Sequence, residues 1–541
     1  MKKSYGKLLA VMAAAVLAMT GCSGSGTEES SGSGEQAGSA QAGSTDAAEE
    51  TEAAADGERT VVTIARDFDS TNLDPVMTAN NVDIWVLNMM VEGLVTSSDD
   101  GQEIIPAVAD TWEVSEDGLT YTFHIRDEIK FSNGEDVTIE DCIYSIDRAK
   151  TADGPWIGML DMIDTMEDGG DNNLVITLTE PSPAFLSTLA MFSSSIMPKD
   201  YCEEVGTEGL AENPIGTGPY VLQEWNRGER MVFVKNEYYW EEGSPKVDEI
   251  DMVVVADDST RIMQLQSGQI DVATMIPYSR VDELQNMGGM TVHLFDSTDV
   301  RFIILNCQNE YLSNKSVRQA LNLATDKEAI NSAVYFGHGQ IAQSFLAPAM
   351  PHYKEDLPAV SVDVEAAKQL LADAGYPDGF DLTVEVGSGD STILQTATML
   401  QEQWGEIGVN LNIQQIDIAT ARQNWQAGEY DVFLSNMTSD MTDSSEVAGL
   451  WCISEQANCW RSYWDDADQD QAEELCRLGN SEMDEELRMD YYGQMQEVVA
   501  DAVPVIPLVY APFAVVTSDR VTGLAQTPLG IYNVKNMEIA K

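Results

Sequence analysis

Residues 213–276 constrain the fold of this chain more than any other stretch, because they begin with a backbone bend that few sequences can form. The bend reads Pro-Ile-Gly-Thr-Gly-Pro. Gly216 and Gly218 can adopt backbone angles that a Cβ atom forbids. Pro214 and Pro219, on either side of them, fix φ. We therefore expect a rigid turn that leads directly into a strand.

Two strands and a helix should follow this bend. Residues 220–225 and 231–234 have the pattern of strands, and residues 226–229 between them fit a hairpin turn. The helix after them should end at Gly268, which suits a left-handed C-cap. Near the end of the chain, the continuous apolar run 504–516 predicts one buried strand.

Other stretches predict an α/β fold. A strand over 380–386, a helix over 392–407 and a strand over 410–416 form the alternation of a βαβ unit. An earlier helix should begin at Thr138, with Asp141 three residues later completing a capping box. A chain of 541 residues is too long for one core and indicates about three to four such domains.

The charge of the chain excludes one class of partner. There are 91 acidic and 29 basic residues, which gives a net charge of −62. Such a field repels phosphate backbones, so we expect no nucleic-acid binding. It also repels anionic lipid, so contact with a membrane needs a separate anchor.

The N-terminus supplies an anchor of this kind. Three lysines precede an apolar run over 8–19, which is too short to span a bilayer. The run ends in Thr20-Gly21-Cys22, which resembles a lipobox and implies cleavage after a signal peptide of residues 1–21. The sulfur of Cys22 would then be lipidated, and two acyl chains hold a protein to a membrane.

The ordered features of the chain resemble those of the extracellular solute-binding proteins of family 5, the peptide- and nickel-type receptors of ABC importers. After the glycine bend come Trp225, the Asn-x-x-Tyr-Trp run at 236–240 and the Ser-Gly-x-Ile-Asp run at 267–271. A Phe-x-x-Gly-x-x-x-Thr-x-x-Asp run at 131–141 continues the resemblance. It implies an α/β, two-lobed periplasmic-binding-protein-like fold (type II, cluster C) with an extra α+β domain.

The resemblance also implies a division into domains. The parts are lobe I over 59–95, 196–298 and 507–541, an extra domain II over 96–195, and lobe II (domain III) over 299–506. Residues 22–58 precede them as an acidic Gly/Ser tether, whose composition predicts disorder.

Candidate ligand contacts follow from the same resemblance. In the family a strand leads into Gly-Trp-x-x-Asp, and in peptide-binding members that acid pairs with the peptide α-amino group. Asp440 matches the acid, whereas Asn436 and Met437 replace the glycine and the tryptophan. Further candidates in segments that resemble cleft-lining ones are Trp425, Trp156, Tyr510, Asn80 and Asn81. Core packing for these aromatic residues and a turn for the asparagines are equally simple explanations.

These features together favour a lipid-anchored substrate-binding receptor of an ABC importer on the outer face of a bacterial cell membrane. It would capture a small solute, with a peptide favoured, between its lobes and deliver it to the permease as a monomer. No cofactor, no metal and no enzymatic activity are expected. The alternatives are a secreted hydrolase that acts on glycans and a surface adhesin or signalling receptor that reuses the fold.

Cys452 and Cys459 are expected to form a disulfide. They lie seven residues apart in a loop-like segment of a chain that is exported. Similar short bridges occur in some dipeptide-binding relatives.

Deletion of the tether tests the division between tether and folded body. A chain that begins at Arg59 should be soluble, and its ligand affinity should equal that of the longer chain, because the removed residues contribute to no core. Calorimetric titration and circular dichroism of both chains measure this. Loss of folding in the shorter chain would contradict the prediction.

Overall fold

The computed structural model describes residues 59–540, and it describes no side chains for residues 456–459. The predicted signal peptide, Cys22 and the tether therefore lie outside the described residues. The side chain of Cys459 does so too, and the disulfide with Cys452 stays a prediction. Among the described residues, no helix combines the length and the apolar character needed to cross a membrane.

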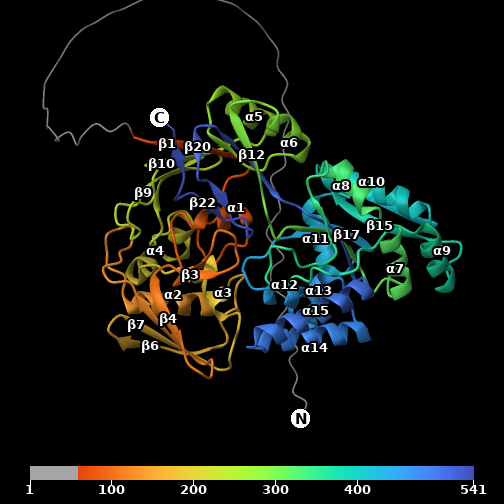
Figure 1. Ribbon diagram of the computed structural model, residues 1–541, viewed down its shortest axis with the longest axis horizontal. Helices are drawn as coiled ribbons and strands as arrows, with labels where there is room; N and C mark the ends of the chain where they lie inside the picture. The colour runs from red at the N-terminus through yellow and green to blue at the C-terminus, as the bar shows by residue number, and fades with distance from the viewer. Residues whose placement is uncertain (1–58, 541) are drawn as a thin grey trace, which may run out of the picture. The chain divides into compact units, whose positions relative to one another are not determined.

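A seven-stranded sheet has the strand order β12-β19-β11-β1-β10-β9-β8. Figure 1 labels its strands β1, β9, β10 and β12. Strands β8 and β9 form the predicted hairpin, and β1 runs parallel to β10 and β11. The helix α5 ends as predicted at Gly268, whose φ is 71°. The elements are β1 (Val61–Arg66), α1 (Asn81–Leu87), β8 (Tyr220–Asn226), β9 (Arg230–Lys235), β10 (Glu249–Val254), α5 (Asp258–Ser267), β11 (Val272–Ala273), α6 (Tyr278–Gln285), β12 (Met290–Phe295) and β19 (Phe513–Ser518).

The glycine bend that leads into β8 packs against the chain just after α1. The Gly218 amide donates to the Met90 carbonyl at 3.0 Å. A Cβ atom on Gly218 would lie 2.5 Å from the Met90 carbonyl carbon, and one on Gly216 would lie 2.8 Å from the Met90 oxygen. Neither glycine has a positive φ. The glycines are thus needed for close approach of two backbones rather than for the unusual backbone angles that we expected.

A four-stranded antiparallel sheet, in the order β4-β5-β7-β6, packs against α2. The predicted capping box of α2 is confirmed, because the Thr138 hydroxyl accepts from the Asp141 amide and the Asp141 carboxylate accepts from the Thr138 amide. The elements of this part are β2 (Val95–Ser97), β3 (Ile104–Pro106), β4 (Ala109–Val114), β5 (Thr120–Ile125), α2 (Ile139–Thr151), β6 (Ile163–Gly170), β7 (Asn173–Leu178), α3 (Phe185–Leu189), η1 (Phe192–Ser194) and α4 (Lys199–Glu212).

A six-stranded sheet has the order β14-β18-β13-β17-β15-β16. Strands β15 and β16 are parallel and α10 lies against both, which confirms the predicted βαβ unit (Figure 1). Its elements are β13 (Val300–Leu305), α7 (Lys315–Leu323), α8 (Lys327–Val334), β14 (Gln340–Ile341), α9 (Val364–Asp373), β15 (Phe380–Gly387), α10 (Ser391–Gly405), β16 (Val409–Ile416), α11 (Ile418–Ala427), β17 (Val432–Met437), α12 (Ser445–Cys452), α13 (Ser454–Arg461), α14 (Ala467–Ser481), α15 (Glu485–Ala502) and β18 (Val505–Tyr510).

The single strand predicted over 504–516 is wrong. The run divides into β18, which lies in the six-stranded sheet, and β19, which lies in the seven-stranded sheet. Pro512, between them, has no amide to donate to a ladder. The predicted boundary of lobe I at residue 507 therefore falls inside β18. Four short strands close the chain as two ribbons, β20 (Val521–Thr522) with β23 (Glu538–Ile539) and β21 (Ala525–Gln526) with β22 (Tyr532–Asn533).

A buried ion pair ties the segment after β17 to α15. The Arg488 guanidinium donates to both carboxylate oxygens of Asp443 at 2.6 and 2.7 Å, and its Nε donates to the Gly479 carbonyl at 2.9 Å. Only 4% of the arginine side chain and 6% of the aspartate side chain are exposed. Neither charge can turn to water if its partner is removed, so each depends on the other.

Replacing Arg488 with methionine should lower the free energy of unfolding by about 3–5 kcal/mol, because the Asp443 carboxylate stays buried without a partner. The matched control is Lys368→Met at the exposed pair Lys368–Glu365, where the side chains are 46% and 86% exposed. It should change the free energy by about 0–1 kcal/mol. Urea unfolding of the two ligand-free variants measures both effects. Equal losses would contradict the assignment of the buried pair.

Candidate functional site

The loop after β17 is the place where the three sheets come together. The Asn81 side chain, at the start of α1, donates to the Thr438 hydroxyl at 3.3 Å. Met441 packs with Ala184 and Met191, which belong to the part with the four-stranded sheet. The loop therefore places polar groups and an apolar wall beside one another, which is the composition of a small-molecule site.

Asp440 lies in this loop next to a second acid, Glu446 of α12. The Glu446 carboxylate accepts from the Asp440 amide at 3.0 Å, and the Ser439 hydroxyl lies 2.9 Å from the same oxygen. Both acids are half-buried. No hydrogen bond to the Asp440 carboxylate is formed within the described residues.

The pKa values of both acids are raised. Burial is the larger cause at Asp440, and the neighbouring Glu446 carboxylate adds to it, which puts the pKa of Asp440 well above its usual value. Burial also raises the pKa of Glu446, although its hydrogen bonds from the Asp440 amide and the Ser439 hydroxyl act in the opposite direction. Two like charges held close together disfavour ionisation of both, and a cation between them would relieve the repulsion.

Asn436 and Met437 lie on opposite faces of the six-stranded sheet, because successive residues of a strand alternate. The Asn436 amide donates to Asp299 at 3.1 Å. Met437 packs against the other face, in the core that contains Phe433 and Trp451. These two replacements of the family's glycine and tryptophan therefore have different surroundings.

The two tryptophan candidates occupy different environments. The Trp156 indole donates to the Thr78 carbonyl at 2.7 Å, and the ring packs on Met441 and edge-on to Phe192 at 5.2 Å. Trp156 thus lies beside the Asp440 loop. Trp425 stacks on Phe433 at 5.1 Å inside an aromatic cluster and does not contact that loop through any described interaction.

The remaining candidates, Asn80, Asn81 and Tyr510, also lie in different surroundings. Asn80 is exposed and its side chain donates to the Thr71 hydroxyl at 3.1 Å, whereas Asn81 reaches the Asp440 loop through Thr438. Tyr510 is buried, and its hydroxyl bonds the backbone of Ser344. Its ring lines a different cavity of about 620 Å³.

Three charged residues near the loop were missed by the sequence analysis. They are Glu446, Asp299 and Arg301. Glu446 falls six residues after Asp440, a spacing with no special meaning until the loop is folded. Arg301 pairs with Asn436 only through the register of β13 and β17, which no local pattern reveals. The chain contains 91 acidic residues, so the sequence alone does not single out Glu446 and Asp299.

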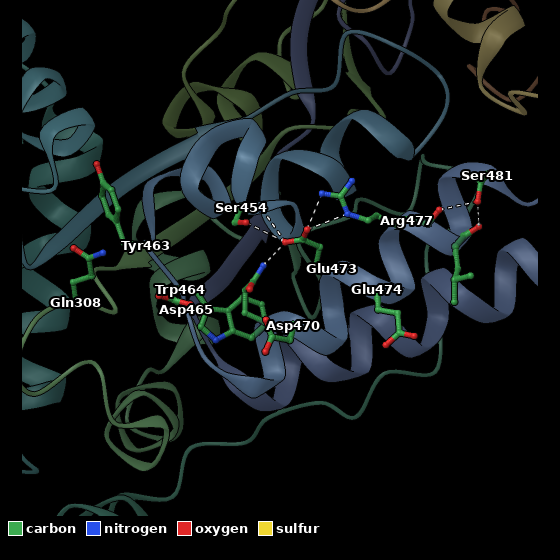
Figure 2. A pocket seen from close by; sticks show the side chains of 12 residues that line it. Gln308, Ser454, Tyr463, Trp464, Asp465, Asp470, Glu473, Glu474, Arg477 and Ser481 are labelled. Carbon is green, nitrogen blue, oxygen red and sulfur yellow. Dashed lines mark hydrogen bonds and ion pairs between the residues drawn. The ribbon is translucent and has the colours of Figure 1, made fainter. Parts of the chain in front are cut away.

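A separate open cavity of about 770 Å³ lies against α14 (Figure 2). Its central acid is Glu473, which accepts hydrogen bonds from Ser454, Gln469 and Arg477. Burial acts to raise the pKa of Glu473, but these donors outweigh it and lower the pKa to about 2. This carboxylate is already satisfied, and none of the predicted ligand residues lines the cavity.

The profile of the bacterial extracellular solute-binding proteins, family 5 Middle, matches residues 103–458. The chain belongs to this family. The dipeptide-binding protein of Escherichia coli is 29% identical to this family 5 protein over 475 residues, which cover 81% of this chain and 86% of the relative. Heme-binding protein A of Haemophilus influenzae is 29% identical over 486 residues, with coverages of 82% and 85%.

A solved structure supports the fold class. The periplasmic binding protein DppA of Helicobacter pylori, solved with the peptide STSA, superposes with a TM-score of 0.79 at 25% identity and covers 89% of this chain and 99% of its own. The neighbours are two-lobed periplasmic binding proteins, which confirms the predicted fold class. Family 5 proteins are binding receptors, so the chain is a substrate-binding protein of an ABC importer and not an enzyme. The hydrolase and adhesin alternatives are not favoured.

The raised pKa of Asp440 predicts a pH-dependent cost in stability. Between the unfolded and the folded pKa the native state binds more protons than the unfolded state, so stability falls as pH rises through that window. Asp440→Asn removes this cost. The ligand-free variant should therefore melt at a higher temperature than the parent at pH 7.5, and the difference should vanish near pH 4.

Calorimetric melting from pH 4 to pH 8 measures this difference. The control is Asp378→Asn, at an exposed residue between α9 and β15, which should show no such trend. A parent that is as stable as Asp440→Asn at pH 7.5 would show that the acid pair carries no electrostatic cost.

Proposed function

We propose that this family 5 protein is a lipid-anchored receptor, held to the outer face of the cell membrane through Cys22. It binds a peptide and, as a monomer, delivers it to the transmembrane subunits of an ABC permease. The proposed ligand contacts are Asp440, Asn436, Met437, Trp425, Trp156, Tyr510, Asn80 and Asn81. The proposed parts are lobe I, domain II and lobe II with the boundaries given above, except that the chain returns to lobe I after β18 rather than at residue 507.

The observation that carries the proposal is the Asp440–Glu446 pair. The Asp440 amide donates to the Glu446 carboxylate, and the Glu446 charge raises the pKa of Asp440, whose own carboxylate accepts no hydrogen bond from the described residues. Two acids this close would form a subsite for a cation. An ammonium group has three donors and a full positive charge, and it matches the free acceptors of Asp440. The relatives' names support a peptide as its source, since one binds dipeptides and another was solved with a peptide.

The surroundings of the pair fit the rest of such a ligand. Met191, Met441 and Trp156 provide an adaptable apolar wall beside the charge. Asn81 and Thr438 bridge the segments on either side of this wall. A peptide bound there would therefore meet one charged end and a surface that accepts several side chains.

Asp440→Asn keeps the shape of the side chain and removes its charge. Its affinity for the solute should fall by about 30-fold or more, since loss of one partner of a desolvated ion pair costs about 2–5 kcal/mol. The solute is identified by native mass spectrometry of protein purified without refolding, and isothermal titration then compares the parent, Asp440→Asn and the control Asp378→Asn. Equal affinities would remove Asp440 from the site.

A further inference from the structure

Lys327, the first residue of α8, is a buried cation that the proposed function does not use. Only 3% of the residue is exposed. Its Nζ atom donates to the Ala342 carbonyl at 3.0 Å, and among the described residues it forms no other hydrogen bond and no ion pair. An ammonium group has three donors, and a buried charge is costly unless it is paired. Lys327 therefore lacks a counter-ion within the part of the chain that the structure describes.

The pKa of Lys327 reflects this missing partner. Burial lowers the pKa to about 8, and the Glu328 carboxylate, which is exposed and next in the sequence, opposes the shift only in part. An amine with a pKa of about 8 is still mostly protonated at pH 7. The side chain is thus a cation at neutral pH, and an anion beside it would relieve the cost of its burial.

Lys327 lines a small cavity between α7, α8, α15 and β18. The volume of about 20 Å³ leaves room for one water molecule or one monatomic ion. Much of the wall is apolar and is formed by Phe345, Pro358, Val360, Val499, Val505 and Pro507. Because such a wall keeps the local dielectric constant low, an anion in the cavity would attract the ammonium group more strongly than it does in water.

The buried polar side chains of the cavity differ in how well they are satisfied. Gln496 accepts from the Ser344 hydroxyl at 2.9 Å and donates to the His352 carbonyl at 2.8 Å. Asn322 of α7 is 9% exposed, and its Oδ1 atom has no hydrogen-bond partner among the described residues. A half turn of its amide brings the Nδ2 donors to the same place. The ammonium group of Lys327 and the amide of Asn322 can then both donate to one anion.

We propose that this cavity binds a halide ion, which is chloride under ordinary conditions. The ion accepts hydrogen bonds from Lys327 and Asn322 and neutralises the buried charge. Sulfate and carboxylates are too large for the cavity. A water molecule would fit, but it would leave the charge of Lys327 unpaired. The site lies against the six-stranded sheet and takes no part in solute binding, so it stands whether or not the solute is a peptide.

Calorimetric melting at pH 7 tests the proposal in sodium chloride, sodium bromide and sodium gluconate of equal ionic strength. Gluconate cannot enter the cavity, so it shows the melting temperature of the empty site. Each halide should raise the melting temperature of the parent by about 2 °C or more, because a ligand that binds only the folded state stabilises it. The shift should level off as the halide concentration rises. Equal melting temperatures in the three salts would overturn the proposal.

Three variants separate this site from a general effect of salt. Lys327→Met removes the charge and should lose the halide shift. Asn322→Asp places a carboxylate in the cavity in place of the ion, so this variant should melt at the same temperature in all three salts. The matched control Lys368→Met, at an exposed lysine of α9, should keep the full shift. A shift that persisted in the first two variants would arise elsewhere on the protein, and the proposal would be wrong.

Crystals of the parent grown in bromide decide the question even if Lys327→Met does not fold. Anomalous diffraction should show a bromide ion in the cavity, within hydrogen-bond distance of the Lys327 Nζ atom. Density without an anomalous signal would identify a water molecule, and bromide found only on the surface would be adventitious. Either result would overturn the halide site.

Discussion

The structure depends on two short crossings between its larger sheets. In the described residues the chain passes from the seven-stranded to the six-stranded sheet between β12 and β13, and it returns between β18 and β19. The crossings are bonded to each other, because the Ala511 amide donates to the Asp299 carbonyl and the Ser297 hydroxyl donates to the Ala511 carbonyl. Thr298 also accepts from the Ser439 amide in the loop after β17. The candidate site is thus built on the residues that join the sheets.

The charged side chains at this junction differ in how completely they are paired. The Asp440 amide donates to the Glu446 carboxylate, whereas Arg301 pairs with Asp299 and has a buried Nε atom without a hydrogen-bond partner among the described residues. Elsewhere the same chain pairs a buried acid completely, as Asp443 does with Arg488. Incomplete pairing is also found elsewhere among the described residues, where buried atoms of Arg66, Arg261 and Asp251 have no hydrogen-bond partner. An unmade hydrogen bond at a buried group lowers stability.

Local elements were predictable from the sequence because their signals are local. The hairpin after Gly218, the capping box at Thr138 and the βαβ unit all follow from spacing within about 40 residues. The strand over 504–516 was mistaken because its apolar run outweighed the break at Pro512. The family resemblance predicted Asp440 as a site residue, but it did not predict the residues that surround Asp440.

The site itself depends on contacts that no local pattern encodes. Arg301 meets Asn436 across a strand pair, and Asn81 meets Thr438 over a separation of 357 residues. Spacing along the chain carries no information about such pairs. The sequence offers the same two explanations for Trp425 and Trp156, a cleft contact or core packing. In the structure Trp425 is stacked on Phe433 in a core, and Trp156 packs against the cluster that contains Met441.

The tight contact at Gly218 gives the glycine bend an influence beyond folding. Any side chain there must push the backbone at Met90, which lies just beyond one end of α1. The other end of this seven-residue helix carries Asn81, whose side chain donates to Thr438 in the loop after β17. The short helix thus connects the glycine bend, near one end, to the Asn81–Thr438 contact at the other. We therefore expect a substitution at Gly218 that displaces Met90 to displace Asn81 and its contact with Thr438 as well.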